Sequence, residues 1–403
     1  METRQESSIV CAVMMLLFMV LLVPLTGNGY VPQRHRSTVV MKISTAEAAS
    51  SATAFARAAT VGSGLQRPNV AVIDLLGDSS AANDIVGGLR RYGEVWEQQK
   101  ALLQERVEAL SQLPGRGMAE GEVCPLHDAL ILVEHFPVFT LGSSTKDDDV
   151  SKLWEDNEGF TAAEHTAQTR DSQPEVVRVD RGGEATWHGP GQLVTYPVLD
   201  LRRYKKDIHW YLRALEEVGI RACTWTLLEA LEGEPAAANV SFEYAQKRLA
   251  ENWGVRFGRV LGYTGCWLLD DADSALEAYG HLGQDTDHAA AHPAAAGGLR
   301  LPTKVMATGV SVKRWITQHG IAINCNCDTS WASKKIVPCG IEDLPVGSLQ
   351  GIADALRSQS DRGLHCNSDG AITPRDARPH VVRAFAEIFT CEAVLGDPTD
   401  GAT

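Results

Sequence analysis

Two residues that lie far apart in the chain, Cys339 and Lys304, have local surroundings that suit nucleophilic chemistry. Pro338 fixes the backbone just before the thiol and Gly340 permits a sharp turn after it, so Cys339 could stand at the tip of an accessible bend. Lys304 precedes an apolar run, where a lysine must snorkel, pair with an anion or have its pKa lowered. A lowered pKa would make Lys304 a general base near neutral pH. A small buried cysteine and a solvated lysine are the ordinary alternatives.

A third candidate is the glycine-rich segment 181–201, which reads RGGEATWHGPGQLVTYPVLDL. Glycine at this density indicates a backbone at positive φ, or one that another group approaches closely. The β-rich runs 176–179 and 193–196 flank the segment, so its ordinary interpretation is a hairpin turn with a hydrogen-bonded His188. A histidine and an arginine held on such a loop could instead serve a ligand.

The run Cys325-Asn326-Cys327, with Cys339 downstream and His319 upstream, raises the alternative of a zinc site. Zinc sites favour cysteine pairs separated by two to four residues, with a second pair at a matching distance. Two thiols that stand two positions apart on a strand merely share one face of it. The spacing therefore favours ordinary thiols, and we expect no metal.

Pairs of basic residues interrupt an acidic chain whose formal net charge is −14. This charge argues against non-specific binding to nucleic acid. Such pairs are usually solvated, but close in sequence to the glycine-rich segment and Cys339 they could form a dock for an acidic partner. The pairs are Arg202-Arg203, Lys205-Lys206, Lys313-Arg314 and Lys334-Lys335.

Apolar patterning predicts the elements that must position these residues. Strands and helices mix without a regular βαβ alternation, which favours an α+β fold over a doubly wound sheet. Two stretches near 232–245 and 271–301 break the patterning and are interpreted as insertions. Helices are expected at 84–110, 207–231, 347–357 and 378–389, and strands at 70–76, 128–133, 265–269, 305–313 and 320–324.

The first 67 of the 403 residues have the composition of a targeting leader. Residues 9–25 are continuously apolar apart from Pro24, with a length between that of a signal-peptide core and a membrane span. The stretch that follows is rich in Ser, Thr and Ala and has a single acidic residue, Glu47, beside Arg34, Arg36, Lys42 and Arg57. This bipartite pattern is typical of proteins sent to plastids of secondary origin. The alternatives are a retained signal anchor, a mis-called first exon or a mitochondrial destination.

Globular sequence begins near residue 68 and would form one domain to residue 403. The nine cysteines are mostly scattered, which indicates reduced thiols rather than a disulfide framework.

A series of motifs stands in the same order as in a known enzyme family. Segment 181–201 carries R-G-G, H-G-P-G-Q-L, Y-P and D-L. It is preceded by E-H-F-P and T-L-G at 134–142, and followed by D-I-H-W-Y at 207–211, T-G-C-W at 264–267, Lys304, Gly309-Val310, His319-Gly320, Ala322, Asn324 and P-C-G at 338–340. From about residue 92 to 341 the chain resembles the lipoyl(octanoyl) transferases, the octanoyl-[acyl carrier protein]:protein N-octanoyltransferases of lipoate biosynthesis. Trp187 in place of Tyr, Cys266 in place of Val and the two insertions depart from the family pattern.

The resemblance implies a biotin/lipoate protein ligase-like α/β fold, with a mixed sheet flanked by helices and a Cys/Lys dyad. Cys339 would be the nucleophile that accepts the octanoyl group, and Lys304 its general base. A neutral lysine within hydrogen-bond reach can take the proton of the thiol. The residues implied to line the acyl pocket or to position the thioester are Arg181, Gly182, Gly183, His188, Gly189, Tyr196, His135, Gly309, Val310, Gly320 and Ala322.

The same resemblance implies two macromolecular partners. The donor would be octanoyl-acyl carrier protein, and the acceptor a lysine on the lipoyl domain of a 2-oxoacid dehydrogenase or on glycine-cleavage H protein. Exchange between thioesters is nearly thermoneutral and aminolysis is downhill, so no ATP, metal or cofactor is expected. We expect a monomer that binds no nucleic acid and has no stable membrane association once the leader is removed.

Two other functions compete with this one. A lipoate–protein or biotin–protein ligase of the same fold would activate its acid with ATP and would not require a cysteine nucleophile, so Cys339 in its P-C-G setting argues against it. A degenerate homologue that only binds acyl groups or acts as a scaffold would not need both Cys339 and Lys304. The insertion at 271–301 directly precedes Lys304, so the position of the base is the expectation that depends most on the tertiary structure.

Overall fold

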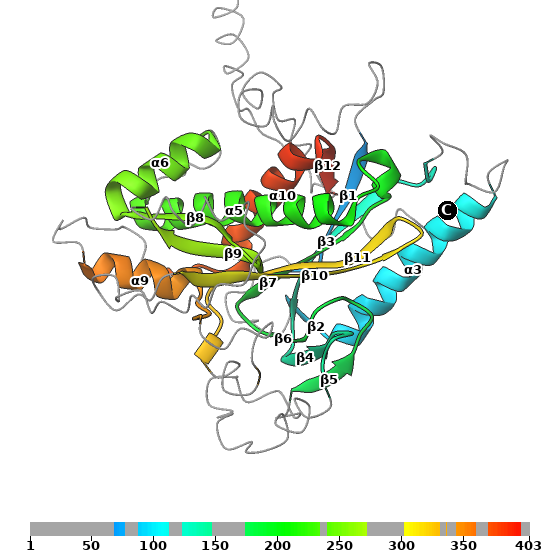
Figure 1. Ribbon diagram of the computed structural model, residues 1–403, viewed down its shortest axis with the longest axis horizontal. Coiled ribbons are helices and arrows are strands. Elements are labelled where there is room, and N and C mark those ends of the chain that lie inside the picture. The colour runs from blue at the N-terminus through cyan, green and yellow to red at the C-terminus, as the bar shows by residue number, and fades with distance from the viewer. Residues whose placement is uncertain are drawn as a thin grey trace, which may run out of the picture. The chain divides into compact units, whose positions relative to one another are not determined.

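A mixed β-sheet forms the centre of the molecule, and helices pack on it (Figure 1). The computed structural model describes residues 68–76, 88–112, 123–146, 174–233, 240–271, 302–330, 336, 344–359 and 370–395. The described strands of this sheet follow the order β12 (Glu392–Leu395), β1 (Asn69–Asp74), β3 (Asp128–His135), β7 (Gln192–Val198), β11 (Ile316–Asn324), β10 (Thr303–Lys313), β9 (Tyr263–Asp270) and β8 (Val255–Val260), with β2 (Leu89–Arg90) also paired to β3. The pairs β12–β1, β1–β3 and β2–β3 are parallel and the rest antiparallel. The expected mixed sheet is confirmed.

Alternation along β3 separates the two faces of the sheet. Leu130 and Leu132 join the large core under helices α5 (Ile208–Glu232) and α10 (Pro374–Phe389), whereas Ile131 and Val133 join a smaller core under α3 (Tyr92–Ser111). Successive strand residues point to opposite faces, so one strand serves both cores. On β7 the same alternation places Tyr196 on the α3 face, and this decides which side of the sheet can hold a site with that residue.

Helix α5 is the buried centre of the larger core. Asp207 caps its amino end by accepting the N–H of Trp210, and Gly233 ends it in the left-handed conformation at φ 67°. Nearly every position from Ala214 to Leu228 is buried, because α10 and the sheet enclose the helix. The strongest helical pattern in the sequence is therefore confirmed as the main structural support of the sheet.

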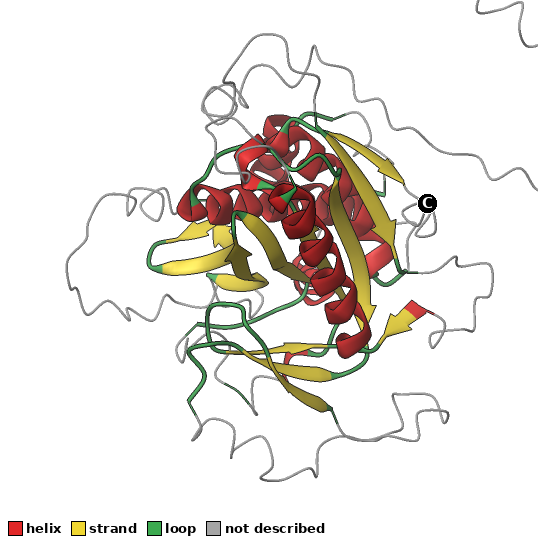
Figure 2. Cartoon of the chain, turned by 90° about the vertical axis from the view of Figure 1, so that its right-hand side faces the viewer, coloured by secondary structure: helices red, strands yellow, loops and turns green. Residues whose placement is uncertain are grey.

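Residues 185–188 of the glycine-rich segment lie in a separate three-stranded sheet, away from α5 and α10 (Figure 2). It consists of β5 (Glu175–Arg178), β4 (Val138–Leu141) and β6 (Ala185–His188). The interpretation of residues 182–191 as a simple hairpin turn is wrong, since β6 lies within them and pairs antiparallel with β4. Ala185 and Trp187 are buried against Phe139 and Leu141, and this packing forms a strand too short to leave an alternating pattern.

Several other elements differ from the predictions: strands β4, β8 and β12 were not predicted, and β11 begins at Ile316 rather than at Gly320. The helix expected from residue 84 begins at Tyr92, since Leu89 and Arg90 pair with β3 instead. Helix α6 (Phe242–Trp253), capped by Ser241, was not predicted, and its first turn overlaps the proposed insertion 232–245. Helix α9 (Leu349–Gln359) and α10 match the two predicted C-terminal helices. Residues 272–301 of the second insertion lie outside the described residues.

Within the described ranges, no helix is both long enough and apolar enough to cross a membrane. The predicted leader, residues 1–67, falls outside those ranges and stays a prediction.

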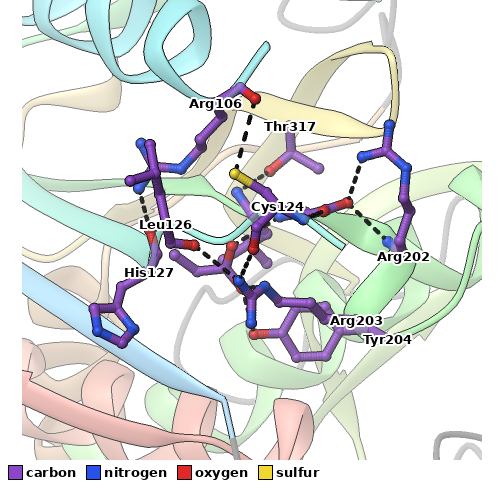
Figure 3. Close-up of polar contacts among 11 residues, drawn as sticks. Arg106, Cys124, Leu126, His127, Arg202, Arg203, Tyr204 and Thr317 are labelled. Carbon is purple, nitrogen blue, oxygen red and sulfur yellow. Dashed lines mark hydrogen bonds and ion pairs between the residues drawn. The ribbon is translucent and has the colours of Figure 1, made fainter. Parts of the chain in front are cut away.

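A buried cluster of charged groups fastens α3 to the end of β7 and to the short helix η2 (Leu201–Arg203) (Figure 3). Asp128 Oδ1 accepts the N–H of Asp200 at 2.8 Å, and its Oδ2 accepts the Tyr204 hydroxyl at 2.9 Å. The Arg203 guanidinium lies 3.7 Å from Asp128 and donates to the carbonyl of Leu126. Burial of Asp128 nevertheless outweighs these partners and raises its pKa to about 6.

The raised pKa of Asp128 predicts how stability should depend on pH. Between pH 4 and 6 the folded protein binds a proton at Asp128 that the unfolded chain does not, so this residue's contribution to stability is largest in acid and is lost as the pH rises through about 6. Relative to Asp128→Asn, wild type should gain roughly 1–3 kcal/mol of unfolding free energy between pH 7.5 and 5. Denaturant unfolding of both proteins at the two pH values measures this, and a constant difference would contradict it.

Candidate active site

A pocket opens on the α3 face of the main sheet, between that face and the small sheet. Its walls come from α3, from the glycine-rich segment and from the middle of the β10–β11 hairpin, so the pocket exists only once these distant segments meet. The lining residues are Tyr92, Arg181, Thr186, His188, Val194, Tyr196, Ala307, Thr308, Gly309, His319, Gly320, Ile321 and Ala322.

The guanidinium of Arg181 holds the glycine-rich loop in shape. Its Nη1 donates to the carbonyls of Gly182 and Glu184 at 3.0 and 2.9 Å, and its Nη2 donates to the carbonyl and hydroxyl of Thr140, both at 2.9 Å. Gly182 N–H bonds the carbonyl of Val310 at 3.0 Å, which fastens this loop to β10. Arg181 therefore positions the wall, and its buried charge is shared among backbone oxygens.

His135 stands behind Tyr196 and is not one of the lining residues of the pocket. Its Nε2 lies 2.9 Å from the Tyr196 hydroxyl and its Nδ1 lies 3.1 Å from the carbonyl of Arg90. Burial lowers the pKa of His135 to about 4, so the ring is neutral at pH 7. The carbonyl of Arg90 can only accept, so Nδ1 donates to it and Nε2 accepts the tyrosine proton. His135 thus orients a pocket residue.

His188 lines the pocket at the end of β6. Its Nδ1 lies 2.7 Å from Gln192 Oε1, and its ring stacks at 6.1 Å on that of Tyr92. Burial is the main reason why the pKa of His188 falls to about 3, and the neighbouring His135 lowers it further. The turn that follows is fixed by Glu134, whose Oε1 accepts the N–H of Gly191 at 2.6 Å.

Tyr92 and His319 are pocket residues that the sequence did not assign to the site. The Tyr92 hydroxyl lies 3.3 Å from His319 Nδ1, and His319 Nε2 lies 2.8 Å from Asp180 Oδ1. His319 has φ 57° within a strand, a conformation that L-residues rarely adopt and that is often found at functional sites. Its N–H donates to Gln99 of α3 at 2.8 Å. The sequence offered one indication that His319 belongs to the site, the His319-Gly320 motif. That motif does not predict a contact between His319 and α3.

Lys304 is buried at the start of β10, and its side chain is only 3% exposed. Its Nζ has no hydrogen-bond partner among the described residues and lies 5.3 Å from the ring centroid of Trp267. The backbone of Lys304 accepts the N–H of Gly347 and donates to the carbonyl of Pro345, both at 2.9 Å. Lys304 thus enters the strand as predicted, with its amine turned away from solvent.

Gly265 makes room for the Lys304 side chain. It has φ +123°, and a Cβ there would lie 2.9 Å from Lys304 Cε and 2.3 Å from the carbonyl oxygen of Met306. The peptide is held by Glu216, whose Oε1 accepts the Gly265 N–H at 3.1 Å. Glu216 is itself fully buried and paired with Arg213 and Arg259 at 2.6 and 2.9 Å. A buried ionic network therefore fixes one side of the lysine slot.

Cys339 lies outside the described residues, so its distance from Lys304 is untested. Two described cysteines, Cys325 and Cys327, have thiols that are poor nucleophiles. Burial raises the pKa of Cys325, and raises that of Cys327 to about 12, which keeps both thiols protonated. Within the described part of the chain, no three His, Cys, Asp or Glu side chains gather closely enough to hold a metal ion.

Two of the basic pairs meet at the tip of the β10–β11 hairpin. Arg202 Nη2 donates to the carbonyl of Arg314 at 2.8 Å. Three lysines close to these arginines in sequence are exposed, namely Lys205, Lys206 and Lys313. Lys313 and Lys304 occupy opposite ends of β10, about 30 Å apart. A partner seated on this tip would be far from the candidate base. Lys334 and Lys335 lie outside the described residues.

The structure brings about half of the expected pocket residues together. Arg181, His188, Tyr196, Gly309, Gly320 and Ala322 line the pocket. The others have supporting positions: a Cβ on Gly189 would meet the Trp187 ring at 2.2 Å, and Gly183 adopts φ +84° in the loop. Gly182 and Val310 are joined by a backbone hydrogen bond that fastens the loop to β10, and His135 lies behind Tyr196.

Comparison with known proteins agrees with this architecture. Residues 92–360 match the family model described as lipoyl protein ligase A/B catalytic domain. An octanoyltransferase of Nostoc punctiforme is 33% identical over 313 residues, which are 78% of this chain and 90% of the relative. A second from Nostoc sp. is 32% identical over 76% of this chain and 91% of its own length. An octanoyltransferase of Arabidopsis thaliana described as chloroplastic is 27% identical, over 76% of this chain and 77% of its own length.

The chain belongs to the lipoyl protein ligase A/B catalytic domain family. With relatives of this similarity that are octanoyltransferases, it is an acyltransferase of that family, as expected from its motifs.

Proposed function

We propose that this acyltransferase moves an octanoyl group from octanoyl-acyl carrier protein to a lysine of a lipoyl domain, through a thioester on Cys339 with Lys304 as general base. The observation that carries the proposal is the state of Lys304, which is buried, fixed by its backbone and without a hydrogen-bond partner among the described residues. A lysine with only a structural role is rarely buried without an anion, and this supports a chemical role for the Lys304 amine.

Chain connectivity supports the pairing of Cys339 with Lys304. Cys339 precedes Leu344 by five residues, and the next residue, Pro345, accepts a hydrogen bond from the Lys304 backbone at 2.9 Å. Five residues span at most about 18 Å. On its other side, Cys339 follows Ile336 by three residues, and Ile336 packs against Trp187 beside the glycine-rich segment. Both flanks are thus tied to the walls of the candidate site.

The chemistry follows from these two groups. In the first half-reaction Lys304 takes the Cys339 proton, the thiolate attacks the octanoyl carbonyl, and the departing carrier thiolate recovers a proton from Lys304. In the second, the acceptor amine attacks the enzyme thioester, its proton passes to Lys304, and the Cys339 thiolate leaves with that proton. Each half-reaction returns Lys304 to its starting state, so neither ATP nor a metal enters the balance.

The pocket on the α3 face suits an acyl chain. Val194, Ala307 and Ala322 supply apolar walls, and Gly309 and Gly320 add bare backbone to the lining. Each methylene buried there contributes about 0.8 kcal/mol. A chain of eight carbons therefore supplies enough binding free energy to hold the donor thioester in place.

We place the protein in a plastid. Two kinds of relative support this location, because the Arabidopsis octanoyltransferase is described as chloroplastic and close relatives come from cyanobacteria. The leader composition of residues 1–67 gives the same indication. A fluorescent fusion of these residues that accumulates in mitochondria would contradict the proposal.

Intact-mass spectrometry tests the reaction directly. Wild-type protein mixed with octanoyl-acyl carrier protein, without ATP or added metal, should gain one octanoyl group, and peptide mapping should place it on Cys339. Cys339→Ser should gain no thioester, while Cys327→Ser serves as a control that should behave as wild type. An unmodified wild-type protein, or a requirement for ATP and free octanoate, would point instead to a ligase reaction.

A further inference from the structure

His188 is the first member of a chain of hydrogen bonds formed by buried side chains. Its Nδ1 lies 2.7 Å from Gln192 Oε1, Gln192 Nε2 lies 2.9 Å from Asn324 Oδ1, and Asn324 Nδ2 lies 3.0 Å from the carbonyl oxygen of Gly347. All three side chains are 7% exposed or less. Because no solvent competes at these positions, the direction of each bond follows from its partners.

The carbonyl of Gly347 sets the direction of the whole chain. A carbonyl can only accept, so Asn324 must present its NH2 group there and its oxygen towards Gln192. Gln192 then presents its own NH2 group to that oxygen. A second acceptor, the carbonyl of Trp187 at 3.4 Å from Gln192 Nε2, fixes the same orientation independently. Gln192 Oε1 is thus left to face His188 and can only accept, so His188 Nδ1 carries the hydrogen.

The other ring nitrogen of His188 is therefore a hydrogen-bond acceptor. Burial holds the pKa of His188 at about 3, and His135, Arg181 and His319 all oppose a positive charge on it, so the ring is neutral at pH 7. With one proton, and that proton on Nδ1, the lone pair is on Nε2. No described residue forms a hydrogen bond with Nε2, while the ring lines the pocket.

We propose that Gln192 and Asn324 are positioning residues that hold His188 as a hydrogen-bond acceptor for the N–H of the incoming lysine amine. This rests on the proposed function. The octanoyl chain and its thioester bring no donor to the pocket, and the charge that grows on the carbonyl oxygen needs donors, so His188 Nε2 serves neither. The acceptor amine brings two N–H groups. His188 would orient one of them and would transfer no proton, while Lys304 accepts the proton that leaves.

The same chain connects the pocket wall to the candidate base. Gly347, whose carbonyl receives Asn324, donates its own N–H to the Lys304 carbonyl at 2.9 Å. The position of His188 is thus coupled through Asn324 to the strand that carries Lys304. A network of this kind keeps the group that orients the amine and the group that deprotonates it at a constant separation.

Nitrogen-15 NMR of the histidine rings tests the positioning without any substrate. In wild-type protein at pH 7, His188, assigned by the loss of its signals in His188→Phe, should show a protonated Nδ1 and an unprotonated Nε2. Gln192→Leu should abolish this preference. Gln99→Leu is the matched control, because Gln99 is also buried but contacts only the backbone N–H of His319, and it should leave the His188 signals unchanged. A protonated Nε2 in wild type, or an unchanged tautomer in Gln192→Leu, would overturn the positioning role.

The two half-reactions test the role in catalysis. In His188→Phe, which keeps an aromatic ring but lacks the acceptor, the octanoyl adduct should form within threefold of the wild-type rate. Its discharge to a lipoyl domain should be at least tenfold slower. His209→Phe, at an exposed histidine on α5, should change neither rate. Equal slowing of both steps would overturn the amine role. Absence of any adduct on wild-type Cys339 would refute the proposed function, and with it the role of His188 in orienting the acceptor amine. The NMR experiment would still decide which ring nitrogen of His188 carries the proton.

Discussion

Replacement of Lys304 by methionine should abolish octanoyl transfer and leave the protein at least as stable as wild type. Methionine keeps the length of the side chain and its packing on Trp267 and Gly265, but it has no amine to take the thiol proton. Loss of a general base lowers a rate by about 10²–10⁴. The lysine Nζ has no hydrogen-bond partner among the described residues, so removing it leaves no described group unpaired and takes away a buried polar group.

The measurement combines the rate of octanoyl adduct formation with denaturant unfolding. Lys304→Arg should be inactive too, because a guanidinium stays protonated and is too large for the slot beside Gly265. Lys313→Met, at an exposed lysine on the same strand, should retain the wild-type rate and stability. An active Lys304→Met enzyme, or one inactive only because it is unfolded, would remove the case for Lys304 as the base.

Replacement of Gly265 by alanine should have the largest effect on stability. The new Cβ would stand 2.3 Å from the carbonyl oxygen of Met306, a backbone atom that cannot move without disturbing β10, and 2.9 Å from Lys304 Cε. The peptide cannot swing away, because Glu216 holds its N–H at 3.1 Å. Overpacking together with the unfavourable φ should cost roughly 2–5 kcal/mol. The protein that still folds should transfer octanoyl groups at least tenfold more slowly, since the lysine is displaced.

Gly262→Ala separates the two causes of this effect. Gly262 also has a positive φ, +80°, but a Cβ there would meet nothing within 4 Å. Gly262→Ala should therefore lower the unfolding free energy only by the strain of alanine at positive φ, about 1–2 kcal/mol. It should keep the wild-type transfer rate. Thermal and denaturant unfolding of both variants measures the difference. If the two alanines destabilise the protein equally, the close packing of Gly265 on Lys304 is not what limits the site.

Much of the scaffold could be predicted from local pattern. The apolar patterns of α5 and β10 extend over many residues, so these two elements are close to their predicted bounds, whereas β11 begins four residues before its predicted start. Strand β6 was missed because four residues between glycines carry too short a pattern. The same holds for β2, a strand of two residues that shortened the predicted helix α3. Short elements are formed by their packing partners, which the local sequence does not specify.

The site was predicted less completely than the fold. His188 and Tyr196 were recognised because they stand in motifs that resemble those of the family, and both line the pocket. His135 was recognised by the same reasoning, yet its ring lies behind Tyr196, since the alternation of β3 and the register with β7 turn it there. Tyr92 and His319 stand 227 positions apart and became pocket partners only when α3 packed on β11.

The sequence by itself determined the order of the motifs, the periodicity of the long elements and the family to which the chain belongs, because each depends on residues close together along the chain. Its resemblance to the family motifs also made Lys304 and Cys339 the candidates for the catalytic pair. Only the tertiary structure decided that Lys304 is enclosed by Gly265 and Trp267, and that the direction of the Gln192–Asn324 hydrogen bonds sets the proton on His188. These properties depend on strand register, burial and the pairing of donors with acceptors across the sheet. Such contacts join residues that are distant in the chain, so the local sequence does not predict them.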